Sequence, residues 1–182
     1  MDRKEFLAAA GLFGACFCCG TTASAESASP QPASVDPREL AALQAKIDFM
    51  QRRFGRLIAV LDEPTRAKVL DALGTECARN FSGLTQKYKG RPKEFLEAGK
   101  RGWMESASYD EKTGEIHVVD KPGNCTCAFV KQGLTPAEFC ACTLAWQKEA
   151  YSTILGVPVG AELESSILRG DRQCAFKIRR KV

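Results

Sequence analysis

Residues 135–180, TPAEFCACTLAWQKEAYSTILGVPVGAELESSILRGDRQCAFKIRR, contain the clearest structural signals in the chain. Thr135 is a capping residue, Pro136 suits the first helical position, and Glu138 follows three residues after the cap, which is typical of a helix start. Gly156 and Pro158 are typical of a helix end. This part of the chain therefore predicts one helix that stops just before Pro158.

The rest of the same stretch has the pattern of a β-hairpin. Val157–Leu168 and Cys174–Arg180 predict strands, and the Gly-Asp pair within Arg169–Arg172 favours a tight turn between them. The densest positive run of the chain, Lys177–Lys181, belongs to the last strand and alternates with apolar residues. We interpret it as the solvated end of an edge strand.

A second hairpin and a further strand are predicted before residue 135. Ser106–Asp110 and Glu115–Val119 flank a turn that ends at Gly114, where a left-handed residue is needed. Cys125–Val130 also has the pattern of a strand. The order of these elements predicts an α+β fold, with N-terminal helices, an antiparallel sheet with a helix packed across it, and a C-terminal β-hairpin.

The N-terminal helices include one long apolar stripe. Asp36-Pro37-Arg38-Glu39 is a strong helix start, and the helix is expected to run to about Leu61. Its apolar residues are spaced alternately by three and four positions: Leu40, Leu43, Ile47, Met50, Phe54, Leu57 and Leu61. Such a stripe packs either against its own domain or against a second copy, so a homodimer through helix 36–61 is the alternative.

Two shorter helices should follow the first. One is expected from about Thr65 to Phe81, with Cys77 on its apolar face and therefore assigned to the core. The other is expected near Lys93–Lys100.

Residues 1–25 have the layout of an export signal. Their continuously apolar part, Phe6–Cys19, is shorter than the ~20 residues that a membrane-spanning helix needs. Arg3-Lys4-Glu5-Phe6-Leu7 resembles a twin-arginine signal in which Lys4 replaces the second arginine. Cleavage after Ala23-Ser24-Ala25 predicts a periplasmic protein, whereas lipid attachment at Cys16 would give a lipoprotein of the cell envelope.

The remaining chain is divided into a tether and one domain. Residues 26–35 are rich in Ser, Ala and Pro, which favours a disordered tether, and residues 36–182 are expected to form a single cysteine-rich α+β domain. The net charge of +4 is spread along the chain, so no basic stripe points to nucleic acid. Neither a nucleophile–histidine–acid motif nor a phosphate-binding loop is found, which disfavours serine-hydrolase and nucleotide chemistry.

Six cysteines lie outside the export signal: Cys77, Cys125, Cys127, Cys140, Cys142 and Cys174. They could form three disulfides, ligate a metal ion, or be small buried residues of the core. In a strand, Cys125 and Cys127 would face one side and converge on one ion. In a helix, Cys140 and Cys142 diverge by roughly 200°, so at most one of them joins that pair.

The preferred metal cluster is therefore Cys125, Cys127, Cys174 and one of Cys140 or Cys142. Zinc is favoured because it accepts thiolates without redox demands, although iron stays open. The single histidine, His117, lies in a predicted strand, where it could be a ligand, a general base or a solvated side chain.

The C-terminal third resembles a known family. Gly170-Asp171, Cys174 and Phe176 form a Gly-Asp-x-x-Cys-x-Phe motif after a helix, and this part of the chain is similar to the 4-vinyl reductase-like small-molecule-binding domain. It also resembles the L-2-amino-thiazoline-4-carboxylic acid hydrolase-like proteins. The resemblance implies a small-molecule-binding role, and in zinc-containing members it implies ligands at positions matched here by Cys140, Glu162 or Glu164, and Cys174. Ser166 stands where a third cysteine is expected.

The sequence thus favours an exported domain that binds a small molecule or a metal ion at a cysteine-based site. One alternative is a hydrolase of a small sulfur heterocycle or amide, in which a metal-activated water or a thiolate attacks. The other is a disulfide-stapled structural lipoprotein.

Overall fold

The computed structural model describes residues 36–181, apart from residues 124 and 126. The expected export signal, Cys16 and the tether lie outside the described residues. The chain divides into two units, Met1–Ala45 and Lys46–Val182, and the described part of the first consists of the first turns of α2. No helix in the described ranges is long and apolar enough to cross a membrane.

Helices precede the sheet, as predicted. The elements are α2 (Pro37–Val60), α3 (Glu63–Asn80), α4 (Ser82–Lys87), α5 (Pro92–Arg101), β1 (Met104–Tyr109), β2 (Ile116–Asp120), the 3₁₀ turn η1 (Ala137–Phe139), α6 (Cys140–Leu155), β3 (Val159–Ser165), the 3₁₀ turn η2 (Ile167–Arg169) and β4 (Ala175–Arg180). The start of α2 follows the predicted chemistry, because the Arg38 backbone N–H donates to Asp36 Oδ1 over 2.8 Å. Helix α4 was not predicted.

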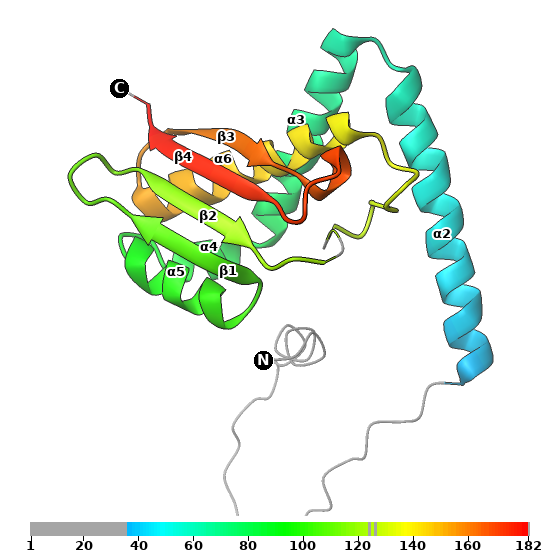
Figure 1. Cartoon of the computed structure of the whole chain (residues 1–182), viewed down its shortest axis with the longest axis horizontal. Helices are drawn as coiled ribbons and strands as arrows, with labels where there is room; N and C mark the ends of the chain where they lie inside the picture. Colours follow the sequence, from blue (N-terminus) through cyan, green and yellow to red (C-terminus); the bar gives the residue numbers. More distant parts are fainter. Residues whose placement is uncertain (1–35, 124, 126, 182) are drawn as a thin grey trace, which may run out of the picture. The chain divides into compact units, whose positions relative to one another are not determined.

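The four strands form one antiparallel sheet in the order β1-β2-β4-β3. Figure 1 shows β4 between β2 and β3, with α6 behind the sheet. Both hairpins were predicted, and Gly114 turns the first of them with φ +71. The interpretation of β4 as an edge strand was wrong, because β2 of the first hairpin pairs with β4 of the second and encloses it.

The inner face of the sheet packs against α5 and α6. Phe95 of α5 and Tyr151 of α6 are almost completely buried, and their rings meet edge to face with centroids 5.6 Å apart. The buried members of this first cluster are Phe95, Leu96, Met104, Ile116, Val118, Tyr151, Ile154, Val159, Phe176 and Ile178. This layer holds the two hairpins together as one sheet.

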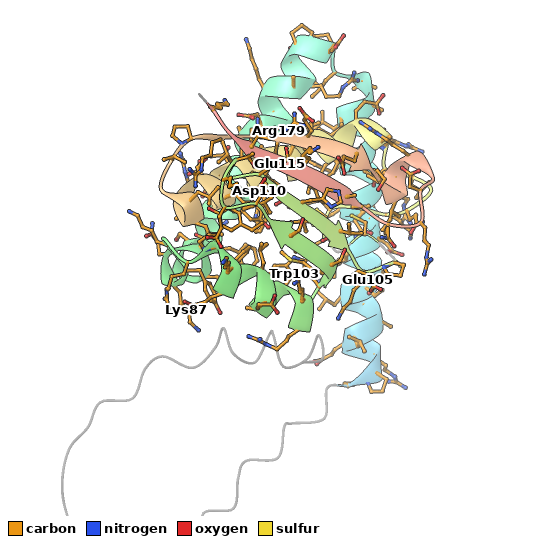
Figure 2. All side chains as sticks on the ribbon, turned by 60° about the vertical axis from the view of Figure 1, so that its left-hand side comes forward. Lys87, Trp103, Glu105, Asp110, Glu115 and Arg179 are labelled. Carbon is orange, nitrogen blue, oxygen red and sulfur yellow. The ribbon has the colours of Figure 1, made fainter. Side chains whose placement is uncertain are left out.

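The outer face of the sheet is charged. Glu115, directly before β2, accepts a hydrogen bond from Arg179 of β4 over 2.9 Å and also lies 3.3 Å from Lys177. Figure 2 labels Glu115 and Arg179. The alternation of charged and apolar residues in β4 therefore reflects one polar face and one buried face.

A second hydrophobic cluster joins α2, α3 and the segment between β2 and α6. Its buried members are Ile58, Leu70, Val130, Phe139 and Cys142. Gln51 Nε2 of α2 donates to the Ala128 carbonyl over 2.7 Å, and Lys131 pairs with Asp48 over 2.8 Å. The strand predicted for Cys125–Val130 is absent from the described residues of this segment, because its backbone turns at Cys127 and is fastened to α2.

The assignment of Cys77 to the core was wrong, since its side chain is exposed. Helix α3 buries Leu70, Gly74 and Ala78 instead. A Cβ atom at Gly74 would collide with the carbonyl of Cys142 in α6. A glycine at this position therefore permits the close approach of α3 and α6.

Candidate functional site

A small, partly open cavity lies where the first turn of α6 meets β3, η2 and the start of β4. Its volume of ≈ 20 Å³ gives room for about one water molecule. Three cysteines and two hydroxyl-bearing residues line it, and the other walls are apolar. The lining residues are Cys125, Val130, Phe139, Cys140, Thr143, Leu163, Ser166, Ile167, Leu168, Cys174 and Phe176.

The three thiols come from three separate segments. Cys125 lies in the segment fastened to α2, Cys140 is the first residue of α6, and Cys174 directly precedes β4. The sheet order explains this gathering, because β4 runs next to β2, whose end leads into the Cys125 segment. The fold therefore joins distant cysteines around one space of atomic size.

Ser166 is completely buried between two of these thiols. Its Oγ and the Sγ of Cys140 share a hydrogen bond at 2.9 Å, and it also accepts from the Leu168 backbone N–H over 3.1 Å. The Ser166 backbone N–H donates to Asp171 Oδ2 over 2.7 Å, which holds the turn before β4. Ser166 is therefore a fixed polar wall of the cavity.

The electrostatics of the cavity favour neutral thiols. Burial raises the pKa of Cys125 to about 11. Burial also raises the pKa of Cys174, partly offset by hydrogen bonds from the Ile167 backbone and the Ser166 side chain. No lining residue in the described part of the chain is charged or a histidine. These two cysteines are consequently thiols rather than thiolates at neutral pH.

The other two predicted metal ligands lie outside the cavity lining. Cys127 and Cys142 belong to the second hydrophobic cluster, and burial raises the pKa of Cys142 to about 12. Cys140 and Cys142 thus diverge, as helix geometry predicted. Cys125 and Cys127 were expected to converge, but that inference depended on a strand that the segment does not form.

The histidine and the two candidate acids lie on the outer face of the sheet. His117 Nε2 is 2.5 Å from Glu164 Oε2, and both side chains are about 40% exposed. Glu162 accepts from Arg179 over 3.2 Å. None of these three side chains lines the cavity, so His117 is the solvated strand histidine that the sequence analysis left open.

Sequence reasoning missed a half-buried acid beside the cavity. Asp120 follows Ile116 and Val118 on the inner face of β2, and its backbone N–H donates to the Cys174 carbonyl over 2.9 Å. Burial raises its pKa to about 6. The Tyr151 hydroxyl is also buried, has no hydrogen-bond partner among the described residues, and is influenced by the Asp120 charge. The period of two along β2 was the available signal.

The arrangement of the described side chains does not fit a zinc ion held by the predicted cluster of four cysteines. In the described ranges, no group of three or more His, Cys, Asp or Glu side chains could hold a metal ion. Protein zinc sites usually supply at least three such ligands. The polar residues that line the cavity are instead three cysteines, one serine and one threonine.

The fold and the cavity together define an α+β domain with a small cavity lined by cysteines. No protein-family model matches this chain, and no curated protein matches it. Among solved structures, a trafficking protein particle complex subunit 3 from Naegleria fowleri, covalently bound to palmitic acid, is 15% identical with a TM-score of 0.48, over 76% of this chain and 97% of that chain. The phenol-responsive sensory domain of the transcription activator PoxR with phenol is 10% identical with a TM-score of 0.49, over 71% of this chain and 74% of that chain. At these TM-scores, neither likeness assigns a ligand to this chain.

Proposed function

We propose that this chain is a binding domain whose thiol cavity takes one soft monovalent metal ion of the Cu(I) class. The proposal is supported by one observation: Cys125, Cys140 and Cys174 line the same cavity of ≈ 20 Å³. A space of this size holds about one atom, and an organic ring would not fit it. The ligand class is therefore chosen by the size of the cavity and by sulfur as its main donor.

A soft ion suits this donor set better than zinc does. Thiolate ligands select Cu(I), whereas carboxylate and carbonyl ligands suit harder ions. Cu(I) is stable with two thiolates, while structural zinc is almost always four-coordinate. Cys140 at the start of α6 and Cys174 just before β4 are the proposed pair of ligands, and Cys125 lines the same cavity. Ligation displaces one proton from each thiol that binds, and these protons leave to solvent.

Binding is better supported than hydrolysis. A cysteine nucleophile needs a thiolate and usually an adjacent base. Burial keeps Cys125 and Cys174 protonated, and His117 pairs with Glu164 on the outer face. The resemblance to the amino-thiazoline-carboxylate hydrolase-like proteins and that to the 4-vinyl reductase-like domain stay sequence-based predictions. The proposal shares with these resemblances only the positions of Cys140, Ser166 and Cys174.

Export to the periplasm or cell envelope is a separate part of the proposal. It is supported only by residues 1–25, and it predicts a shortened or lipid-modified chain in the envelope fraction. Mass measurement of the protein recovered from that fraction tests it. A full-length chain found only inside the cell would contradict export and leave the thiol cavity unaffected.

The binding proposal is tested by competition for Cu(I). Reduced protein is titrated anaerobically into the Cu(I)–bicinchoninate complex, whose absorbance falls when the protein removes the ion. We expect one equivalent to be removed by the wild type. Cys140→Ser and Cys174→Ser should each weaken binding by at least about 100-fold, because each removes a soft ligand.

Cys77→Ser is the matched control, because Cys77 is exposed on α3 and outside the cavity. It should bind Cu(I) as the wild type does. Circular dichroism of all three variants separates lost ligation from lost folding. No Cu(I) uptake by the folded wild type, or uptake abolished by Cys77→Ser alone, would refute the proposal. Stoichiometric zinc retained in competition with Cu(I) would refute the choice of ion.

A further inference from the structure

The apolar stripe of α2 has two different environments. Towards its C-terminal end, Phe54 of the stripe packs against Phe129 and Phe139 with ring centroids 5.3 and 5.7 Å apart, and Ile58, beside the stripe, is completely buried. Nearer its start, the same stripe is open to solvent: in the unit from Lys46, Met50 is 62% exposed and Ile47 is 37% exposed. Packing within the domain thus accounts for only part of the stripe.

The preceding turns of α2 continue the pattern. Leu40 is 59% exposed and Leu43 is 55% exposed. The spacing Leu40, Leu43, Ile47, Met50 is that of alternating a and d positions over two heptads. Four exposed large apolar side chains at this spacing form a narrow seam, whereas a helix that lies on a membrane presents a wider apolar face.

The charges beside the seam favour an antiparallel self-pairing. In that arrangement, Leu40 meets Met50 of the second copy and Leu43 meets Ile47 of the second copy, and two-fold symmetry repeats both layers. The same register sets Glu39 opposite Arg53 of the second copy, again twice. The Arg53 guanidinium lies 4.5 Å from the centroid of the Phe49 ring, on its own helix. Arg53 therefore lies beside the seam and does not cover it.

We infer that the occupant of this seam is the α2 helix of a second copy of this chain, packed antiparallel. The register pairs apolar with apolar residues in all four layers and opposite charges at both ends. Lys46 meets Lys46 of the second copy at the centre, so the pairing is weakened there by like charge. This inference is independent of the thiol cavity.

Sedimentation equilibrium of the full chain tests the pairing. When the protein concentration is raised about hundredfold, the wild type should shift from monomer to dimer. Met50→Glu and Leu43→Glu should each raise the dissociation constant by at least about tenfold, because a carboxylate would be buried in the seam. These side chains are exposed in the single chain, so the variants should keep the wild-type circular dichroism.

Val60→Glu is the matched control. Val60 is 79% exposed on the same helix but lies outside the paired stretch. The dimer of Val60→Glu should therefore have the same dissociation constant as the wild-type dimer. Orientation is tested by Glu39→Arg, which should weaken the dimer, and by adding Arg53→Glu, which should restore it. Lys46→Gln should tighten an antiparallel dimer.

Three results would overturn the inference. The first is a wild type that stays monomeric at the highest concentration. The second is association that Met50→Glu leaves intact. The third is binding of the wild type to phosphatidylglycerol vesicles that Met50→Glu abolishes, which would make a lipid surface the occupant.

Discussion

Replacing Asp120 by Asn should make the protein more stable at neutral pH. Asp120 is half-buried, and burial raises its pKa from 3.8 to about 6. Since the folded state disfavours the carboxylate, the folded protein gains stability from protonation below pH 4 and loses it as the pH rises through about 6. Two pKa units correspond to about 3 kcal/mol of unfolding free energy, as an upper estimate.

The assay is urea denaturation of the wild type and Asp120→Asn between about pH 4 and pH 8, with the difference in unfolding free energy plotted against pH. The difference should rise from pH 4 and level off above pH 7 at about 2–3 kcal/mol in favour of the variant. Asp110→Asn is the control of opposite sign, because backbone hydrogen bonds from Lys112 and Thr113 lower the pKa of the exposed Asp110. A difference that does not change with pH, or one that favours the wild type above pH 7, would refute the buried-carboxylate reasoning.

Three further outcomes follow from the packing and the thiols. Gly74→Ala should lower the unfolding free energy by about 2–4 kcal/mol in urea titrations, because the new Cβ would meet the Cys142 carbonyl. Gly83 in α4 has open space around it, so Gly83→Ala should raise the unfolding free energy by up to about 1 kcal/mol. In native protein, maleimide should label exposed Cys77 first and buried Cys140 only after unfolding, as read by peptide mass spectrometry; equal rates would contradict the burial of Cys140. Cu(I) affinity measured by competition should rise with pH by about tenfold per pH unit for each thiol proton displaced, because the pKa values of Cys125 and Cys174 are raised, and a flat profile would argue against ligation by these thiols.

The elements that could be predicted are those that local chemistry determines. The start of α2 depends on Asp36, and the end of α6 depends on Gly156 at φ +69. The hairpin turn depends on Gly114 at φ +71. Each signal lies within a few residues of the structure that it specifies, so the α+β class and both hairpins were accessible from the sequence.

The elements that could not be predicted depend on distant contacts. Nothing near Lys177 indicates that β4 pairs with β2 and becomes an inner strand. The Cys125–Val130 segment has the composition of a strand, but Gln51 holds its Ala128 carbonyl from 77 positions away. The partial success with the cysteines has the same cause: helix geometry separated Cys140 from Cys142 correctly, and an assumed strand joined Cys125 to Cys127 incorrectly.

The pairing of β2 with β4 also explains why polar groups concentrate beside the cavity. It sets Asp120 next to Cys174, which lines the cavity with Ser166, and the charge of Asp120 influences Tyr151 on α6. An apolar layer would be more stable here, because buried polar groups without full hydrogen bonding cost free energy. Perturbed buried acids and thiols tend to gather where a protein binds or reacts. The destabilising carboxylate of Asp120 and the proposed binding site of the thiols therefore lie in the same region, between α6 and the sheet.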